Sequence, residues 1–192
     1  FISAILGIVC YNYNSKRLSE KAAQSLKFYS RQTAANVDFT VDSMKHVTDY
    51  ILSEQDMLNA MKTLPKYYEK DNYGLGKTIK HNDLLDTLNT GLAMYYINSN
   101  FYRVIIFNEF GDVASSTNTG SKLTNKERNT SDIKWLNSAT RMHGKPILIA
   151  PHMDGWGIRE SEEVFSLARK VQGGDFGYIE VQYATDELKD IF

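Results

Sequence analysis

The sequence has few of the features, such as paired cysteines or an excess of one charge, that would indicate a class of protein directly. It contains one cysteine, Cys10, which excludes a disulfide framework and a multi-cysteine zinc site. Its 22 basic and 23 acidic residues leave a formal net charge of −1, so no long-range field attracts nucleic acid. We therefore expect neither a disulfide-stapled scaffold nor a DNA- or RNA-binding protein.

Signatures of catalysis and of metal binding are also missing. No serine lies in a Gly-x-Ser-x-Gly turn. Gly76-Lys77-Thr78 lacks the earlier glycine of a phosphate-binding loop, because Asp71 stands at that position. His152 and Asp154 form the tightest histidine–carboxylate pair, whereas a metal usually takes three or four ligands. We expect no catalytic residue, no metal and no cofactor in this chain.

Long apolar runs are scarce. The most hydrophobic window, residues 1–11, is too short to cross a bilayer as a helix, which takes roughly 20 residues. It is either the outer end of a transmembrane segment, a buried element of the domain or a remnant of a secretory signal. We assign residues 1–14 to the end of a transmembrane segment or to an N-terminal extension. Because the chain starts at Phe1, we expect a fragment of a longer protein.

A long helical pattern follows, since residues 15–64 contain neither proline nor glycine. Apolar or small side chains recur there at steps of three and four, which is one stripe of a helix. They are Leu26, Tyr29, Thr33, Val37, Val41, Met44, Thr48 and Ile51. We predict a long N-terminal helix over residues 15–64. It either pairs with a second copy through this stripe or divides into two helices on its own sheet.

The rest of the chain, residues 65–192, alternates between helical and strand-like patterns. After a surface loop at 66–82 we predict a helix over 83–98 and a hairpin with strands 102–107 and 113–116. A loop (117–130), a helix (132–142), a strand (146–150) and a second loop (151–162) come next. Two strands (163–171 and 176–183) and a short final helix (186–192) end the chain. This order predicts an α+β fold, an antiparallel sheet with its helices segregated to one side and one end.

These elements and several short motifs resemble the Cache (PAS-like, extracytoplasmic) sensor domains of bacterial transmembrane receptors. The matching features are the long N-terminal helix, Asn108-Glu-Phe-Gly-Asp112 between strands, residues 132–144 and the closing hairpin. The resemblance covers residues 15–192, with 65–192 as the sensor domain. It implies a ligand-sensing domain outside the cell membrane, most like that of a two-component sensor histidine kinase. Amino-acid-binding members carry arginine where Ile133 stands, two residues before Trp135, so amino acids are not implied as the ligand.

In a PAS-like sheet the ligand site lies between a sheet face and the neighbouring loops, with aromatic walls and a few polar groups. The candidates are Arg103, Phe107, Trp135, His152, Asp154, Arg169 and Tyr178. Arg169 alternates with Phe165 and Leu167, and a guanidinium buried on their face needs an acidic partner or an anionic ligand. Alternatively Arg169 reaches solvent, Trp135 belongs to the core, and His152 and Asp154 lie in an exposed loop.

Two other classes of protein stay open. One is a ligand-less dimerisation or adhesion module in which residues 15–64 form a stalk. The other is a cytosolic PAS-like module, which would require residues 1–11 to be buried in the fold. For the receptor we expect as partners a small molecule of unknown identity, the membrane, and a second copy bound through the long helix.

Overall fold

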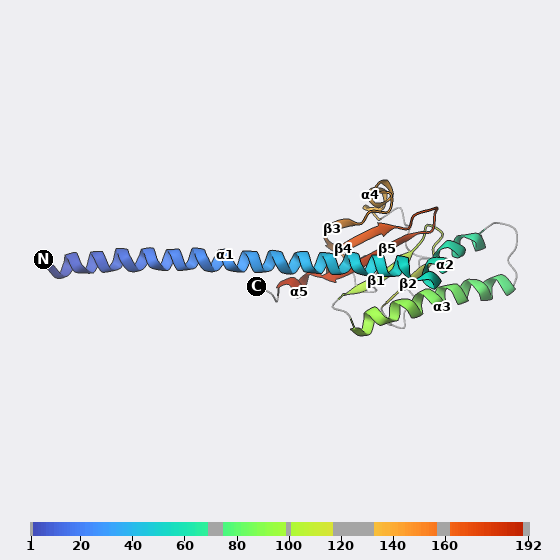
Figure 1. Cartoon of the computed structure of the whole chain (residues 1–192), viewed down its shortest axis with the longest axis horizontal. Coiled ribbons are helices and arrows are strands. Elements are labelled where there is room, and N and C mark those ends of the chain that lie inside the picture. Colours follow the sequence, from blue (N-terminus) through green and yellow to red (C-terminus); the bar gives the residue numbers. More distant parts are fainter. Residues whose placement is uncertain (1, 69–74, 99–100, 117–132, 157–161, 190–192) are drawn as a thin grey trace. The chain divides into compact units, whose positions relative to one another are not determined.

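The computed structural model describes residues 2–68, 75–98, 101–116, 133–156 and 162–189. Its contacts divide the chain into two units, one within residues 1–40 and the other within residues 41–190. The second unit holds the sheet and all helices except the N-terminal part of the first (Figure 1). Predicted loop residues 117–130 lie outside the described residues.

The N-terminal helix α1 (Ile2–Ser53) is longer at its start than the helix predicted from Ser15, since it also includes residues 2–14. It ends where Glu54 adopts an extended backbone (φ −75°, ψ 110°). A second helix, α2 (Gln55–Thr63), follows, and the 3₁₀ helix η1 (Leu64–Tyr68) continues from it. The helix predicted without interruption to Leu64 is thus divided into two, which is the alternative left open above.

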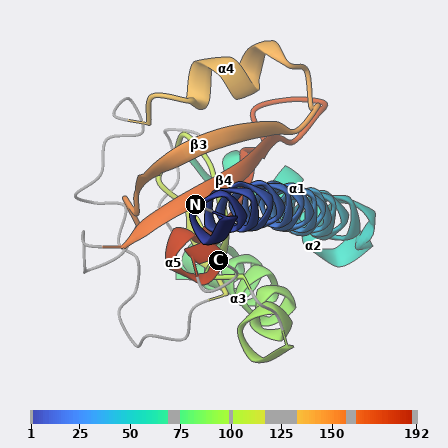
Figure 2. The same cartoon turned by 90° about the vertical axis from the view of Figure 1, so that its left-hand side faces the viewer.

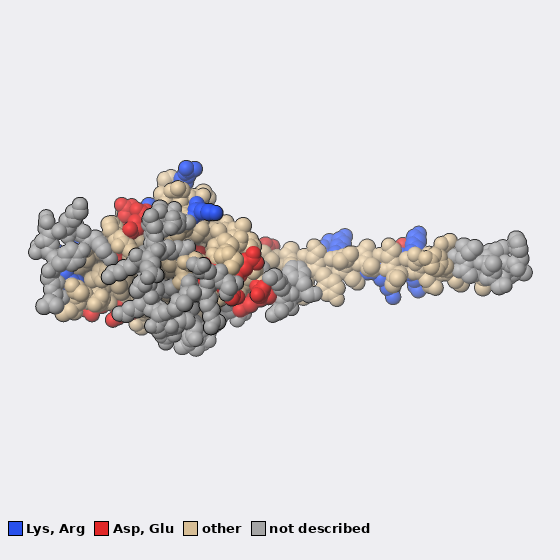
Figure 3. Space-filling view, turned by 180° about the vertical axis from the view of Figure 1, so that it is seen from behind, with Lys and Arg blue, Asp and Glu red and all other residues tan. Residues whose placement is uncertain are grey.

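The N-terminal unit consists of the first part of α1. Residues 10–32 are exposed, including Tyr11, Leu18, Leu26 and Tyr29. Lysine and arginine side chains stand out on this exposed surface in the space-filling view (Figure 3). Within the described residues, no helix combines the length and the apolar character that crossing a membrane requires.

One five-stranded antiparallel sheet organises the second unit, in the order β2-β1-β5-β4-β3. Its strands are β1 (Arg103–Phe107), β2 (Val113–Ser115), β3 (Ile147–Met153), β4 (Glu163–Lys170) and β5 (Tyr178–Ala184). The predicted β1–β2 hairpin is confirmed. Oδ1 of Asn108 accepts hydrogen bonds from the backbone N–H groups of Phe110 and Asp112 (3.0 Å each), and Gly111 takes the positive φ of 101° that the turn requires.

Strand β3 extends further than predicted, to Met153. Pro151 marks a loop in the sequence, but β3 is an edge strand, where a missing N–H leaves no ladder bond unmade. The register with β4 shifts between Ile149 and His152, which accommodates the proline. His152 therefore lies on a strand and not in a loop.

The described part of the unit holds three further helices: α3 (Leu75–Asn98), α4 (Leu136–Arg141) and α5 (Thr185–Lys189). Helix α3 starts before Asp83, so residues 75–82, predicted as loop, are helical. That stretch has no proline and a single glycine, Gly76, whose cost of about 1 kcal/mol a helix of this length can bear. Helix α4 is shorter than the 132–142 predicted; residue 132 lies outside the described part of the chain.

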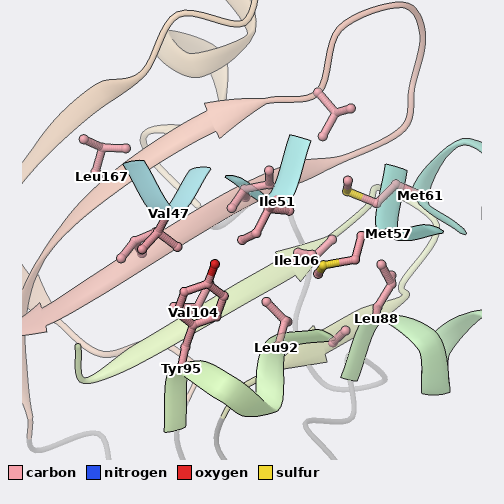
Figure 4. Close-up of a cluster of buried hydrophobic side chains, with 14 of the residues drawn as sticks. Val47, Ile51, Met57, Met61, Leu88, Leu92, Tyr95, Val104, Ile106 and Leu167 are labelled. Atoms are coloured by element: carbon pink, nitrogen blue, oxygen red, sulfur yellow. The ribbon is translucent and has the colours of Figure 1, made fainter. Parts of the chain in front are cut away.

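The main core lies between one face of the sheet and the helices α1, α2 and α3 (Figure 4). The close-up shows side chains from four sources meeting there: Val47 and Ile51 of α1, Met57 and Met61 of α2, Leu88, Leu92 and Tyr95 of α3, and Val104, Ile106 and Leu167 of the sheet. Each such buried apolar side chain contributes about 1.5–3 kcal/mol. Burial also raises the pKa of Tyr95 to about 12. The predicted α+β class with a long N-terminal helix is confirmed.

Candidate functional site

The opposite face of the sheet is also buried, but many of its side chains are polar. Strand alternation points Arg103 and Phe107 of β1, and Glu180 and Gln182 of β5, away from α1–α3. In the register of the strands, Arg103 is paired with Gln182, and Gln182 with Ser166 of β4. Helix α4 lies on this side (Figure 2). Buried polar groups on a sheet face require partners, and their partners define the site.

A buried ion pair occupies one end of this face. Nη1 of Arg103 donates to both carboxylate oxygens of Asp154, at 2.9 and 3.1 Å, and both side chains are almost fully buried. Tyr102 places its ring 5.0 Å from the guanidinium carbon and its hydroxyl 3.5 Å from Asp154 Oδ2. Burial, followed by the nearby Asp154 charge, raises the pKa of the Tyr102 phenol. Asp154 is thereby neutralised within the protein.

Glu180 is a second buried carboxylate, 1% exposed, at the centre of the face. It accepts a hydrogen bond from the indole N–H of Trp156 (2.8 Å) and one from the side-chain amide of Gln182 (3.2 Å). The Gln182 amide also lies 3.3 Å from Asp154 Oδ1, and the Trp156 backbone N–H donates to the same oxygen at 3.0 Å. Trp156 and Gln182 therefore join the two carboxylates into one network.

His152 borders this network, with about 29% of its side chain exposed. Its Nδ1 lies 3.0 Å from the carbonyl of Ala150, and its Nε2 lies 3.4 Å from Ser166 Oγ and 3.8 Å from Glu180 Oε1. The interaction with Glu180 is the main cause that raises the pKa of His152 above its ordinary value of 6.5, although partial burial opposes it. His152 is thus the group whose charge changes most readily next to Glu180.

Aromatic rings form the other end of the face. The Phe107 ring stacks on Tyr178 (5.4 Å between centroids) and contacts Trp156 (4.7 Å) and Trp135 (5.9 Å). The Tyr178 hydroxyl is 2.8 Å from Thr140 Oγ1 of α4 and 3.2 Å from a Glu109 oxygen. Burial is the main cause that raises the pKa of Tyr178. Trp156 touches both the rings and the carboxylates, so the aromatic and polar ends form one continuous surface.

Two buried polar atoms on this face make no hydrogen bond in the described structure: Arg103 Nε and Gln182 Oε1. The exposed fractions of the two residues are 5% and 0%. An unpartnered buried donor or acceptor costs about 1–3 kcal/mol, so a bound molecule that supplies both partners would be stabilised here.

Arg169, the candidate given most weight in the sequence, lies on the other face. It does share the face of Phe165 and Leu167, as its alternation predicts, but that face carries α1. Its Nε donates to the carbonyl of Gly144 at 2.6 Å, and Nη1 contacts Thr48 Oγ1 (3.4 Å) and the carboxylate of Asp49. The acidic partner that a guanidinium requires is thus supplied by α1.

The remaining candidates, Arg103, Phe107, Trp135, His152, Asp154 and Tyr178, are brought together on the face just described. Sequence reasoning missed Tyr102, Trp156, Glu180 and Gln182. For two of them a signal existed: Glu180 and Gln182 follow Tyr178 at steps of two, so β-alternation places them on the face of Tyr178.

A concave region lies between α2 and α3, with a volume of about 590 Å³. Asp56, Asp83 and Asp86 line it and are exposed, as is Met94. Exposed carboxylates are satisfied by water, so this groove, unlike the opposite sheet face, shows no buried group in need of a ligand. Among the described residues, no three His, Cys, Asp or Glu side chains are grouped to hold a metal ion.

Comparison with solved structures shows the same fold in known sensor domains. The sensor domain of the V. cholerae histidine kinase DctB superposes with a TM-score of 0.61 at 13% identity, covering 88% of this chain and 58% of that one. The ligand-binding domain of the Pseudomonas aeruginosa amino-acid chemoreceptor PctC, solved with GABA, gives a TM-score of 0.54 at 12% identity, covering 88% and 66%. This chain thus spans about three fifths of the first and two thirds of the second.

No family model matches the sequence. No curated protein matches it either. The chain has the PAS-like fold of receptor sensor domains, as the resemblance in its motifs implied.

Proposed function

We propose that this chain is the ligand-sensing domain of a membrane-bound signal-transduction receptor, on the outer side of the cell membrane. The observation that carries the proposal is a buried sheet face with charged groups, aromatic walls and unpartnered polar atoms. The fold, shared with the sensor domains of a histidine kinase and a chemoreceptor, supports it. The receptor we propose is a two-component sensor histidine kinase, with no catalysis in these residues.

A ligand on this face could act on α1 through the thickness of the sheet. Ala168 of β4 is paired with Glu180, and the next residue, Arg169, points to the other side and contacts Thr48 and Asp49 of α1. We propose that Arg169 transmits the change in the sheet to α1 rather than contacting the ligand. The ligand shifts this equilibrium only by its difference in affinity for the two arrangements.

The membrane and a second copy are the macromolecular partners in this proposal. Residues 1–14 would continue into a transmembrane segment. Tyr11, Leu18, Leu26 and Tyr29 are exposed apolar side chains that recur at near-helical spacing, which suits a parallel pair of α1 helices. Chemical cross-linking of single-cysteine variants at these positions tests the pairing, after replacement of Cys10 by serine.

A thermal-shift screen of the 192-residue chain tests the sensing function. Amino acids, carboxylates, sugars, purines and amines are the compounds to include. Reproducible stabilisation by one class supports a receptor, because a ligand that binds only the folded state raises the melting temperature. Absence of stabilisation across all classes favours the alternative, a ligand-less dimerisation or adhesion module with a helical stalk.

A further inference from the structure

The two carboxylates on the buried sheet face, Asp154 and Glu180, are not equally compensated by positive charge. This difference indicates the kind of ligand. The inference rests on the proposed sensing function and concerns the same site. Arg103 and Asp154 neutralise each other. Glu180 receives hydrogen bonds from the Trp156 indole and the Gln182 amide, both of which are neutral. While His152 is neutral, Glu180 is held by neutral donors alone, which is costly for a buried carboxylate, so a positive charge next to it would be strongly stabilised.

The orientation of Gln182 adds an independent reason. Its amide nitrogen faces Asp154 and Glu180, so its oxygen, Oε1, points elsewhere and has no partner among the described residues. A donor with two or more N–H groups can bond to this acceptor and to the neighbouring Glu180 carboxylate at the same time. Arg103 stands directly opposite Gln182 in the strand register, and its unpartnered Nε–H requires an acceptor. A ligand with a charged N–H group and an oxygen atom meets these demands.

We propose that this site binds a small organic ammonium compound, whose N–H groups donate to Glu180 and Gln182 Oε1 and whose positive charge replaces a proton on His152.

His152 is the protein's own source of positive charge for Glu180. In the neutral ring Nδ1–H donates to the Ala150 carbonyl, which leaves Nε2 to accept from Ser166. On protonation the ring becomes positively charged, and its Nε2–H can interact with Glu180 Oε1, 3.8 Å away. The other ionisable group that acts on the ring is Asp154, which follows β3 directly and is itself paired with Arg103 of β1. A proton on His152 or a bound monocation can each neutralise the charge of Glu180. Both together would leave an excess positive charge in the network.

The competition predicts a definite pH dependence. Below the raised pKa of His152 the ring holds its proton, and an ammonium ligand must displace it. Affinity then weakens by up to about tenfold for each pH unit of acidification, and binding releases up to about one proton. Above that pKa the ring is neutral, and affinity no longer depends on pH through His152.

The experiment uses the 192-residue chain and five probes. Ethanolamine and putrescine carry ammonium N–H groups; tetramethylammonium has the charge without N–H; succinate is an anion and glucose is neutral. Thermal shift ranks the probes. Isothermal titration calorimetry in buffers of different ionisation enthalpy then counts the protons released. We expect stabilisation by an ammonium probe, with proton release, and none by tetramethylammonium.

Matched variants locate the effect. E180Q keeps the shape and removes the charge, and should weaken ammonium binding by at least about thirtyfold, whereas D86N removes an exposed carboxylate from the α2–α3 groove and should leave it unchanged. H152Q should abolish the pH dependence. Stabilisation confined to succinate, glucose or other non-cationic compounds of the screen overturns this inference and keeps the sensing function. Ammonium binding that ignores E180Q also overturns it. No stabilisation by any compound overturns both.

Discussion

The two faces of the same sheet are buried to a similar degree but differ in chemistry, because on the α4 side buried charged and polar groups stand beside the apolar cluster. Toward α1–α3 the strands present Val104, Ile106, Leu167, Ile179 and Val181, which pack hydrocarbon against hydrocarbon. Toward α4 the same strands present Arg103, Ser166, Glu180 and Gln182, each at most 5% exposed. Apolar residues would fill the second face at lower cost, since replacing buried charges by hydrocarbon is often neutral or stabilising. The polar face is therefore better explained by recognition than by stability.

The largest effect should come from breaking the ion pair of the polar face. Asp154→Ala leaves the Arg103 guanidinium buried without its carboxylate, and we expect the free energy of unfolding to fall by about 3–5 kcal/mol. Urea denaturation measures this loss. The double variant Arg103→Met with Asp154→Leu removes both charges and should recover most of it. A loss under about 1 kcal/mol in Asp154→Ala would mean that water reaches the pair.

A slightly smaller effect is expected on the apolar face. Leu92 of α3 is fully buried, and Leu92→Ala leaves a cavity that costs about 2–5 kcal/mol of unfolding free energy. Leu148 of β3 is 57% exposed, so Leu148→Ala should change stability by no more than about 0.5 kcal/mol. Equal losses in the two variants would contradict the assignment of the core to the α1–α3 side.

The ion pair between Arg169 of β4 and Asp49 of α1 should contribute less still. Asp49 is 62% exposed and Arg169 is 22% exposed, so solvent screens their ion pair. A double-mutant cycle with Asp49→Ala and Arg169→Ala should give a coupling energy of about 0.2–1 kcal/mol, smaller at high salt. A coupling energy of several kcal/mol, unchanged by salt, would show that the pair is effectively buried.

The smallest effect concerns pH. Because the pKa of His152 is raised in the folded state, its protonation stabilises the fold fully below the unfolded value of about 6.5, and this contribution is lost as pH rises through the folded pKa. His152→Gln should therefore lower the free energy of unfolding more in acid than at alkaline pH. The two losses should differ by less than about 1 kcal/mol. Unfolding curves of both proteins across this window measure the difference, and a larger deficit at alkaline pH would reverse the proposed sign.

Local patterns predicted most of the fold, because strand alternation, turn residues and helical stripes are set by neighbours in the sequence. The β1–β2 hairpin and the β4–β5 pair follow from such patterns. The polar network does not: Arg103 and Asp154 are 51 positions apart, and no local pattern pairs them. Glu180 and Gln182 look solvated in the sequence, and only the cover on the α4 side makes them buried. The loop predicted from Pro151 onward was wrong at residues 151–153 for a similar reason: a proline is tolerated in β3 only because β3 lies at the edge of the sheet.

The outer strands of the sheet have a consequence for resistance to aggregation. At one margin β2 is only three residues long, and at the other β3 carries Pro151 and an irregular register. Neither offers the straight row of free N–H and C=O groups onto which a foreign strand could be added. Aggregation by strand addition is thereby discouraged on both sides.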